Sequence, residues 1–145
     1  MNFVLDSSVV LKWYIHEVLT DQAMRLKDHL ESQSQYVAVP EFFFVESANI
    51  LWKKAFLKKE LLRNDAKGIY SRVLDLSFHV IEDEKMLLHA LDLALDHAVS
   101  VYDGLYLACS VYTKAILVTA DSALVRRLEG STLRKSVMFL AEFVI

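Results

Sequence analysis

Short apolar runs alternate with longer segments of mixed polarity along the whole chain. The compact apolar runs predict buried strands, at residues 2–5, 36–39, 77–81, 115–119 and 137–140. The intervening segments predict helices, at residues 9–15, 21–31, 40–59, 64–74, 83–97, 102–113 and 122–128, with Pro40 in the first turn of the third. Strands that alternate with helices in this way predict an α/β domain with a mainly parallel sheet.

Composition narrows the class of protein. The 145 residues are 54% hydrophobic and contain 3 Gly and 1 Pro, which favours a single globular domain over residues 1–145 without long linkers. No apolar stretch approaches the roughly 18 residues of a membrane span, so we expect a soluble, cytoplasmic protein. The single cysteine, Cys109, excludes an internal disulfide and a cysteine metal cluster, and we expect it to be buried.

Four acidic residues from distant parts of the chain are predicted at one edge of the sheet. Asp6 follows the first strand directly, and Asp121 comes two residues after the fourth. Glu46 lies about six residues into the helix that leaves the second strand, and Asp103 opens the helix that leads into the fourth. Because a helix that feeds a parallel strand runs antiparallel to it, all four acids are expected at the carboxyl edge, where ligands bind in such folds.

Each acid also has a simpler interpretation. Asp6, Asp103 and Asp121 could cap or complement helix N-termini. Glu46 lies in mid-helix among aromatic residues, where it has no capping duty and where an apolar helix should be largely buried. An ionised carboxylate in such a place is costly without a cation, and oxygen-only ligands suit Mg²⁺ or Mn²⁺. The four acids together therefore predict a divalent metal site.

The charge balance is less informative. A net charge of -3 argues mildly against nucleic-acid binding, unless several acids are neutralised by metal. Two basic stretches could guide RNA phosphates, although solvated helix ends are the commoner explanation; they comprise Lys53, Lys54, Lys58, Lys59 and Arg63, and Arg126, Arg127, Arg134 and Lys135.

Four fragments in order resemble the PIN-domain nucleases, and most closely the VapC-type toxins of toxin–antitoxin pairs. The fragments are Asp6-Ser7 after an apolar strand, Pro40-Glu-x4-Glu46-x2-Asn49-x-Leu51, Tyr102-Asp103-x2-Tyr106-x-Ala108, and Leu117-Val-Thr-Ala-Asp121-x2-Leu124. The resemblance implies a three-layer α/β/α fold and an endoribonuclease dependent on Mg²⁺ or Mn²⁺. It further implies a homodimer and a small antitoxin partner.

The resemblance also assigns roles to residues. The acidic quartet of the family maps onto Asp6, Glu46, Asp103 and Asp121, with Thr119 and Ser7 as supporting hydroxyl residues. Ser122 stands where some members carry a further acid or amide, which leaves the ligands of a second metal ion open. The role of Glu46, as a metal ligand or as the group that orients the attacking water, also stays open.

Other α/β proteins that gather acids at a sheet edge need residues that this sequence lacks. A receiver domain or a haloacid-type phosphatase would need a second acid close to Asp6, where Ser7 and Ser8 stand instead. A non-catalytic binding module, or an RNA-processing PIN-like nuclease without an antitoxin, is the remaining alternative.

Overall fold

A computed structural model describes residues 1–144 of the chain, and five parallel strands form its centre. The strand order is β3-β2-β1-β4-β5. The strands are β1 (Asn2–Leu5), β2 (Tyr36–Pro40), β3 (His79–Ile81), β4 (Ile116–Thr119) and β5 (Val137–Phe139). Of the two strands next to β1, one follows it along the chain and the other comes about 80 residues later: Phe3 pairs with Val37 on one side and with Ile116 on the other. The predicted parallel sheet is confirmed.

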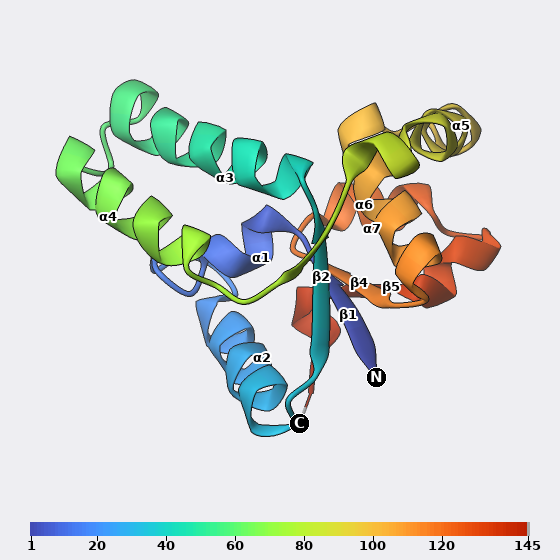
Figure 1. Cartoon of the computed structure of the whole chain (residues 1–145), viewed down its shortest axis with the longest axis horizontal. Helices are drawn as coiled ribbons and strands as arrows, with labels where there is room; N and C mark the ends of the chain where they lie inside the picture. Colours follow the sequence, from blue (N-terminus) through green and yellow to red (C-terminus); the bar gives the residue numbers. More distant parts are fainter. Residues whose placement is uncertain (145) are drawn as a thin grey trace.

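Helices cover both faces of the sheet, with α1 and α2 on one side and α5 and α6 on the other (Figure 1). The helices are α1 (Ser7–Leu11), α2 (Thr20–Ser32), α3 (Phe42–Trp52), α4 (Arg63–Leu74), α5 (Leu87–His97), α6 (Val101–Thr113) and α7 (Ser122–Arg127). The helices α3 and α4 lie side by side and extend away from the sheet (Figure 1). This arrangement is the expected three-layer α/β/α fold.

Short helical turns complete the chain. A π-helix, η1 (Lys53–Leu57), continues α3, and three 3₁₀ turns are η2 (Asp83–Lys85), η3 (Thr132–Ser136) and η4 (Leu140–Glu142). The predicted helices over 40–59 and 83–97 are therefore each divided in two. The predicted strand over 77–81 is shorter, since it begins at His79.

Two predicted helix starts were wrong. The first helix begins at Ser7 rather than Val9 and ends at Leu11, because Asp6 is its N-cap and turns follow from Lys12. Pro40 is the last residue of β2, in register with Ile81, and not part of a helix. Proline has a fixed φ that suits an extended residue at a strand end as well as a first helical turn, so its position alone did not decide between the two.

The core consists of the sheet and the helix faces packed against it. On the adjacent strands β1 and β4, the side chains of Val4, Leu5, Leu117 and Val118 are fully buried. Residues 104–110 of α6 are buried without interruption, and Cys109 is among them, as expected. The helices α5 and α6 approach so closely that a Cβ atom at Gly104 would lie 2.4 Å from the carbonyl oxygen of Ala90.

The expected burial of α3 was only partly correct. Phe43, Ser47 and Leu51 face the interior, whereas Val45 is 67% exposed and Trp52 49% exposed. Because α3 projects beyond the sheet, its outer face has no core to pack against. None of the helices within residues 1–144 is long and apolar enough to cross a membrane.

Candidate active site

Asp6 is held at the end of β1 by groups from two elements. One carboxylate oxygen, Oδ1, accepts a hydrogen bond from the backbone N–H of Ser8 at 3.0 Å, which caps α1. The other, Oδ2, accepts from the hydroxyl of Thr119 at 2.8 Å. Thr119 is fully buried at the end of the neighbouring strand β4, so the parallel register of β1 and β4 brings the two residues together. Asp6 is therefore both a helix cap and a buried, fixed carboxylate.

Glu46 contacts the same region from α3. Its Oε1 atom accepts hydrogen bonds from the hydroxyl of Tyr106, at 2.8 Å, and from the hydroxyl of Ser7. Since α3 begins at Phe42, Glu46 lies four residues, or roughly 6 Å, from the start of the helix rather than the six residues predicted. Ser7 thus stands between Asp6 and Glu46.

Asp103 and Asp121 occupy the first turn and the N-cap of their helices. The N-cap of α6 is Ser100, whose hydroxyl accepts from the N–H of Asp103 at 3.1 Å, so the Asp103 carboxyl has no capping duty. Asp121 is exposed, and its Oδ1 accepts from the N–H groups of Ala123 and Leu124 at 2.9 and 3.3 Å. Asp121 is therefore a helix cap, whereas Asp103 caps no helix but lies in the first turn of α6, where its charge complements the helix N-terminus.

The four carboxylates lie close enough to affect one another electrostatically. Burial, and then repulsion from Asp6 and Asp121, raises the pKa of Asp103 to about 6. The pKa of Glu46 is also raised, mainly by burial and next by repulsion from the charge of Asp6, with a smaller contribution from Asp103. Burial also raises the pKa of Asp6, with a smaller repulsion from Asp121. This is the behaviour of partly buried acids that lie near one another, and Asp6, Glu46, Asp103 and Asp121 together form an acidic rim.

The donor chemistry of this rim fits a divalent cation, although its geometry is not that of a finished metal site. Within residues 1–144, no three or more Asp, Glu, His or Cys side chains form a group that could hold a metal ion. The Asp121 carboxyl is turned toward the N-terminus of α7, and Glu46 Oε1 is occupied by two hydroxyl donors. The ion pairs of this part of the chain include none of the four acids. Carboxylate oxygens are the ligands that Mg²⁺ and Mn²⁺ prefer, and these carboxylates are not already neutralised by the ion pairs just described.

Because the pKa of Asp103 is raised, the free energy of unfolding of the metal-free protein should depend on pH. Between about pH 4 and the folded-state pKa of about 6, the folded protein binds more protons at Asp103 than the unfolded chain does. The contribution of Asp103 to the free energy of unfolding therefore falls as the pH rises through this interval and levels off above it. We expect Asp103→Asn to remove this loss and to stabilise the protein at pH 7.5 by about 1 kcal/mol, after allowing for solvent screening.

Thermal unfolding of the two proteins in EDTA between pH 4.5 and 8 measures this difference. The gain from Asp103→Asn should be larger at pH 7.5 than at pH 4.5. An equal difference at both pH values would contradict the assignment of a raised pKa to this carboxyl.

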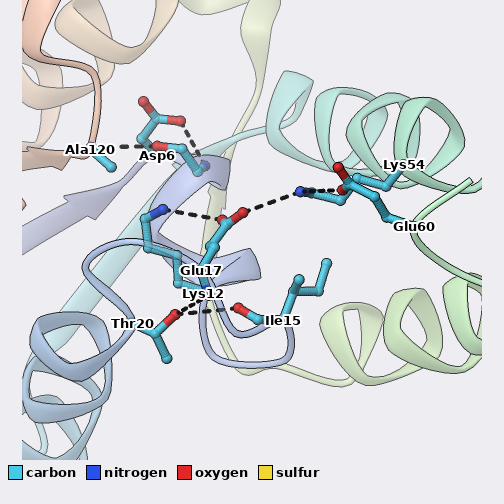
Figure 2. A network of polar contacts seen from close by, with 9 residues as sticks. Asp6, Lys12, Ile15, Glu17, Thr20, Lys54, Glu60 and Ala120 are labelled. Carbon is cyan, nitrogen blue, oxygen red and sulfur yellow. Dashed lines mark hydrogen bonds and ion pairs between the residues drawn. The ribbon is translucent and has the colours of Figure 1, made fainter. Parts of the chain in front are cut away.

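Some of the basic residues considered for RNA contact have structural partners instead. Lys54 forms ion pairs with Glu17 at 3.2 Å and Glu60 at 3.5 Å. Figure 2 shows Glu17 between Lys12 and Lys54, so this chain of charges ties the end of α1 to η1. Arg134 is similarly paired with Glu129 and Glu142. These contacts explain Lys54 and Arg134 without RNA; for the other basic residues the RNA contact stays a prediction.

Tyr106 is the residue at this site to which sequence reasoning gave no role. Its hydroxyl touches Glu46, and burial together with the nearby carboxylates raises the pKa of Tyr106 well above its usual value, so it is a neutral donor. The spacing of Asp103 and Tyr106, three residues apart on one helix, places them on the same face and is the signal that could have identified it.

Known proteins are similar to this chain in sequence and in fold. The family model "PIN domain" matches residues 3–130. Ribonuclease VapC3 of Pyrobaculum aerophilum is 32% identical over 130 residues, which cover 88% of this chain and 95% of that protein. A crystal structure from Pyrobaculum aerophilum superposes with a TM-score of 0.66 at 22% identity and covers 97% of this chain and 85% of its own.

A toxin–antitoxin complex from Klebsiella pneumoniae superposes with a TM-score of 0.63 at 15% identity, covering 97% of this chain and 98% of its own. At these identities the two solved structures support the fold alone. The family match spans most of the chain, and the identity to the ribonuclease extends over nearly its whole length. The chain therefore belongs to the PIN-domain family.

Proposed function

We propose that this protein is a divalent-metal-dependent endoribonuclease and the toxin of a toxin–antitoxin pair, active in the cytoplasm. The observation that carries the proposal is the acidic rim, in which burial and mutual repulsion raise the pKa values of three of the four carboxylates. The ion pairs within residues 1–144 pair none of these carboxylates with a lysine or arginine. The 32% identity to a ribonuclease supports RNA as the substrate.

Asp6, Glu46, Asp103 and Asp121 are the residues proposed to hold Mg²⁺ or Mn²⁺, directly or through water. Such an ion, when bound, offsets the repulsion between the carboxylates and supplies Lewis acidity for phosphodiester hydrolysis. The chain itself fixes the geometry, since Thr119 and the Ser8 N–H hold Asp6 while Ser7 holds Glu46. Glu46 either contributes a ligand or orients the attacking water.

Exposed apolar surfaces support protein partners. A groove of about 660 Å³ between α3, η1 and α4 is lined by Leu51, Trp52 and Phe56, among others. Such a surface favours burial against a partner, and we assign it to the antitoxin because one structural neighbour is a toxin–antitoxin complex.

The exposed leucines of α5, namely Leu87, Leu88, Leu91 and Leu95, form a second apolar surface that supports a homodimer.

The test of the proposed function is RNA cleavage by the purified protein with and without metal. We expect cleavage of a mixed RNA substrate in Mn²⁺ or Mg²⁺, complete loss in EDTA, and recovery when excess metal is restored. A DNA strand of the same sequence tests whether cleavage requires ribose, and we expect the DNA to stay intact. Cleavage that persists in EDTA would contradict the metal dependence.

Expression in bacteria without an antitoxin distinguishes the alternatives. A toxin should arrest growth. A protein that cleaves no RNA and causes no arrest would instead be a non-catalytic module, and cleavage without arrest would favour an RNA-processing nuclease.

A further inference from the structure

Tyr106 lies in the buried centre of α6, yet it carries a polar group into the candidate site. Its side chain is only 1% exposed, and its ring packs edge-on against Phe42, with 6.4 Å between the ring centres. A phenylalanine would fill the same space, so packing does not explain the hydroxyl. The hydroxyl donates a hydrogen bond to Glu46 Oε1 at 2.8 Å.

The hydrogen bonds of Glu46 are unevenly distributed between its two oxygens. Tyr106 and Ser7 both donate to Oε1. For Oε2 the hydrogen bonds within residues 1–144 include no donor, although the side chain is partly buried. Two donors on one oxygen fix the carboxylate plane and leave the second oxygen available for a metal ion or a water molecule.

Tyr106 and Ser7 also reach Glu46 from different directions. Ser7 belongs to α1 and follows Asp6, whereas Tyr106 belongs to α6, one helical turn after Asp103. The side chain of Glu46 is therefore tied to the two segments that carry two of the other acids. Fixed outer hydrogen bonds of this kind set the orientation and basicity of ligating groups.

We propose that Tyr106 is a positioning residue, which holds Glu46 Oε1 so that Oε2 is presented to the cation or water bound by the acidic rim. This inference rests on the proposed metal-dependent function. Its effect is on the carboxylate of Glu46, and Tyr106 itself does not touch the substrate.

The experiment compares Tyr106→Phe with Tyr70→Phe, a matched control. Tyr70 also donates its hydroxyl to a residue of α3, but the acceptor is the backbone oxygen of Phe44, at 2.7 Å. Each substitution removes one hydroxyl and one hydrogen bond to α3, and only the first touches the acidic rim. Mn²⁺ affinity, measured by titration of the metal-free protein and followed by electron paramagnetic resonance, is the main readout.

We expect Tyr106→Phe to weaken Mn²⁺ binding about 10-fold and to lower kcat more than it changes KM. Tyr70→Phe should leave both unchanged, whatever its effect on Tm. In a Glu46→Gln background, Tyr106→Phe should have little additional effect, because both substitutions act on the same carboxylate.

Wild-type Mn²⁺ affinity and cleavage in Tyr106→Phe would overturn the positioning role and leave the proposed function intact. Equal losses in the two tyrosine variants would overturn it as well, because they would indicate a general effect on α3. If the wild-type protein neither binds Mn²⁺ nor cleaves RNA, the proposed function itself fails, and the role of Tyr106 fails with it.

Discussion

Asp6→Asn is expected to reduce RNA cleavage about 1,000-fold, which corresponds to about 4 kcal/mol of lost transition-state stabilisation. Asp6 is the most buried of the four acids, and its charge affects the pKa values of both Glu46 and Asp103. The substitution removes that charge with little change in shape. Asparagine is also a good N-cap, so the hydrogen bond from the Ser8 N–H and the start of α1 should be preserved.

The control for Asp6→Asn is Asp92→Asn, which removes an equal charge from an exposed position on α5. Cleavage rates are measured under single-turnover conditions in saturating Mn²⁺, and thermal unfolding checks that both variants are folded. We expect wild-type activity from Asp92→Asn. An Asp6→Asn protein that keeps more than about a tenth of the activity would remove Asp6 from the catalytic machinery.

The sheet was predictable because its strands are short, apolar and bounded by polar residues. Leu5 is followed by Asp6 and Thr119 by Ala120-Asp121, so the strand ends were visible in the sequence. The helix boundaries were harder, since they depend on groups that the local pattern does not reveal. Pro40 suited both a strand end and a first helical turn, and nothing near Lys53 in the sequence indicated a π-helix.

The strand and helix order was enough to predict four acids near one edge of the sheet, but it did not reveal the groups that hold each of them. Topology places the carboxyl ends of β1 and β4 side by side, and this brings Asp6 next to Thr119. The contact between Glu46 and Tyr106 joins residues 60 positions apart on two helices. Such a contact depends on the rotation of each helix about its axis, which a pattern of apolar residues specifies too coarsely.

A large loss of stability is expected when the close contact between α5 and α6 is disturbed. We expect Gly104→Ala to lower the free energy of unfolding by about 2 kcal/mol and Tm by about 6 °C. The new methyl group would lie 2.4 Å from the backbone oxygen of Ala90, and a backbone atom cannot move aside as a flexible side chain can. The resulting separation of the helices outweighs the gain of about 1 kcal/mol that alanine brings to a helix interior.

Gly68→Ala in α4 is the matched control for this helix contact. A Cβ atom at Gly68 meets nothing within 4 Å, so the substitution should show the helix propensity alone and raise stability by about 0.5–1 kcal/mol. Both variants are measured by thermal and urea unfolding. A Gly104→Ala protein as stable as wild type would mean that α5 and α6 can separate at little cost.

The pairing of β1 with β4 has a consequence for synthesis of the chain. Leu5 is in register with Val118, and Asp6 receives its hydrogen bond from Thr119, so the first strand completes its pairing only with one of the last. Contacts between such distant residues form late in folding, because a long loop must be closed first. On the ribosome, the acidic rim cannot assemble until residues beyond Asp121 have left the exit tunnel. A nascent chain that has not released β4 and Asp121 therefore carries no complete site, and any nuclease activity begins only after that segment has folded against β1.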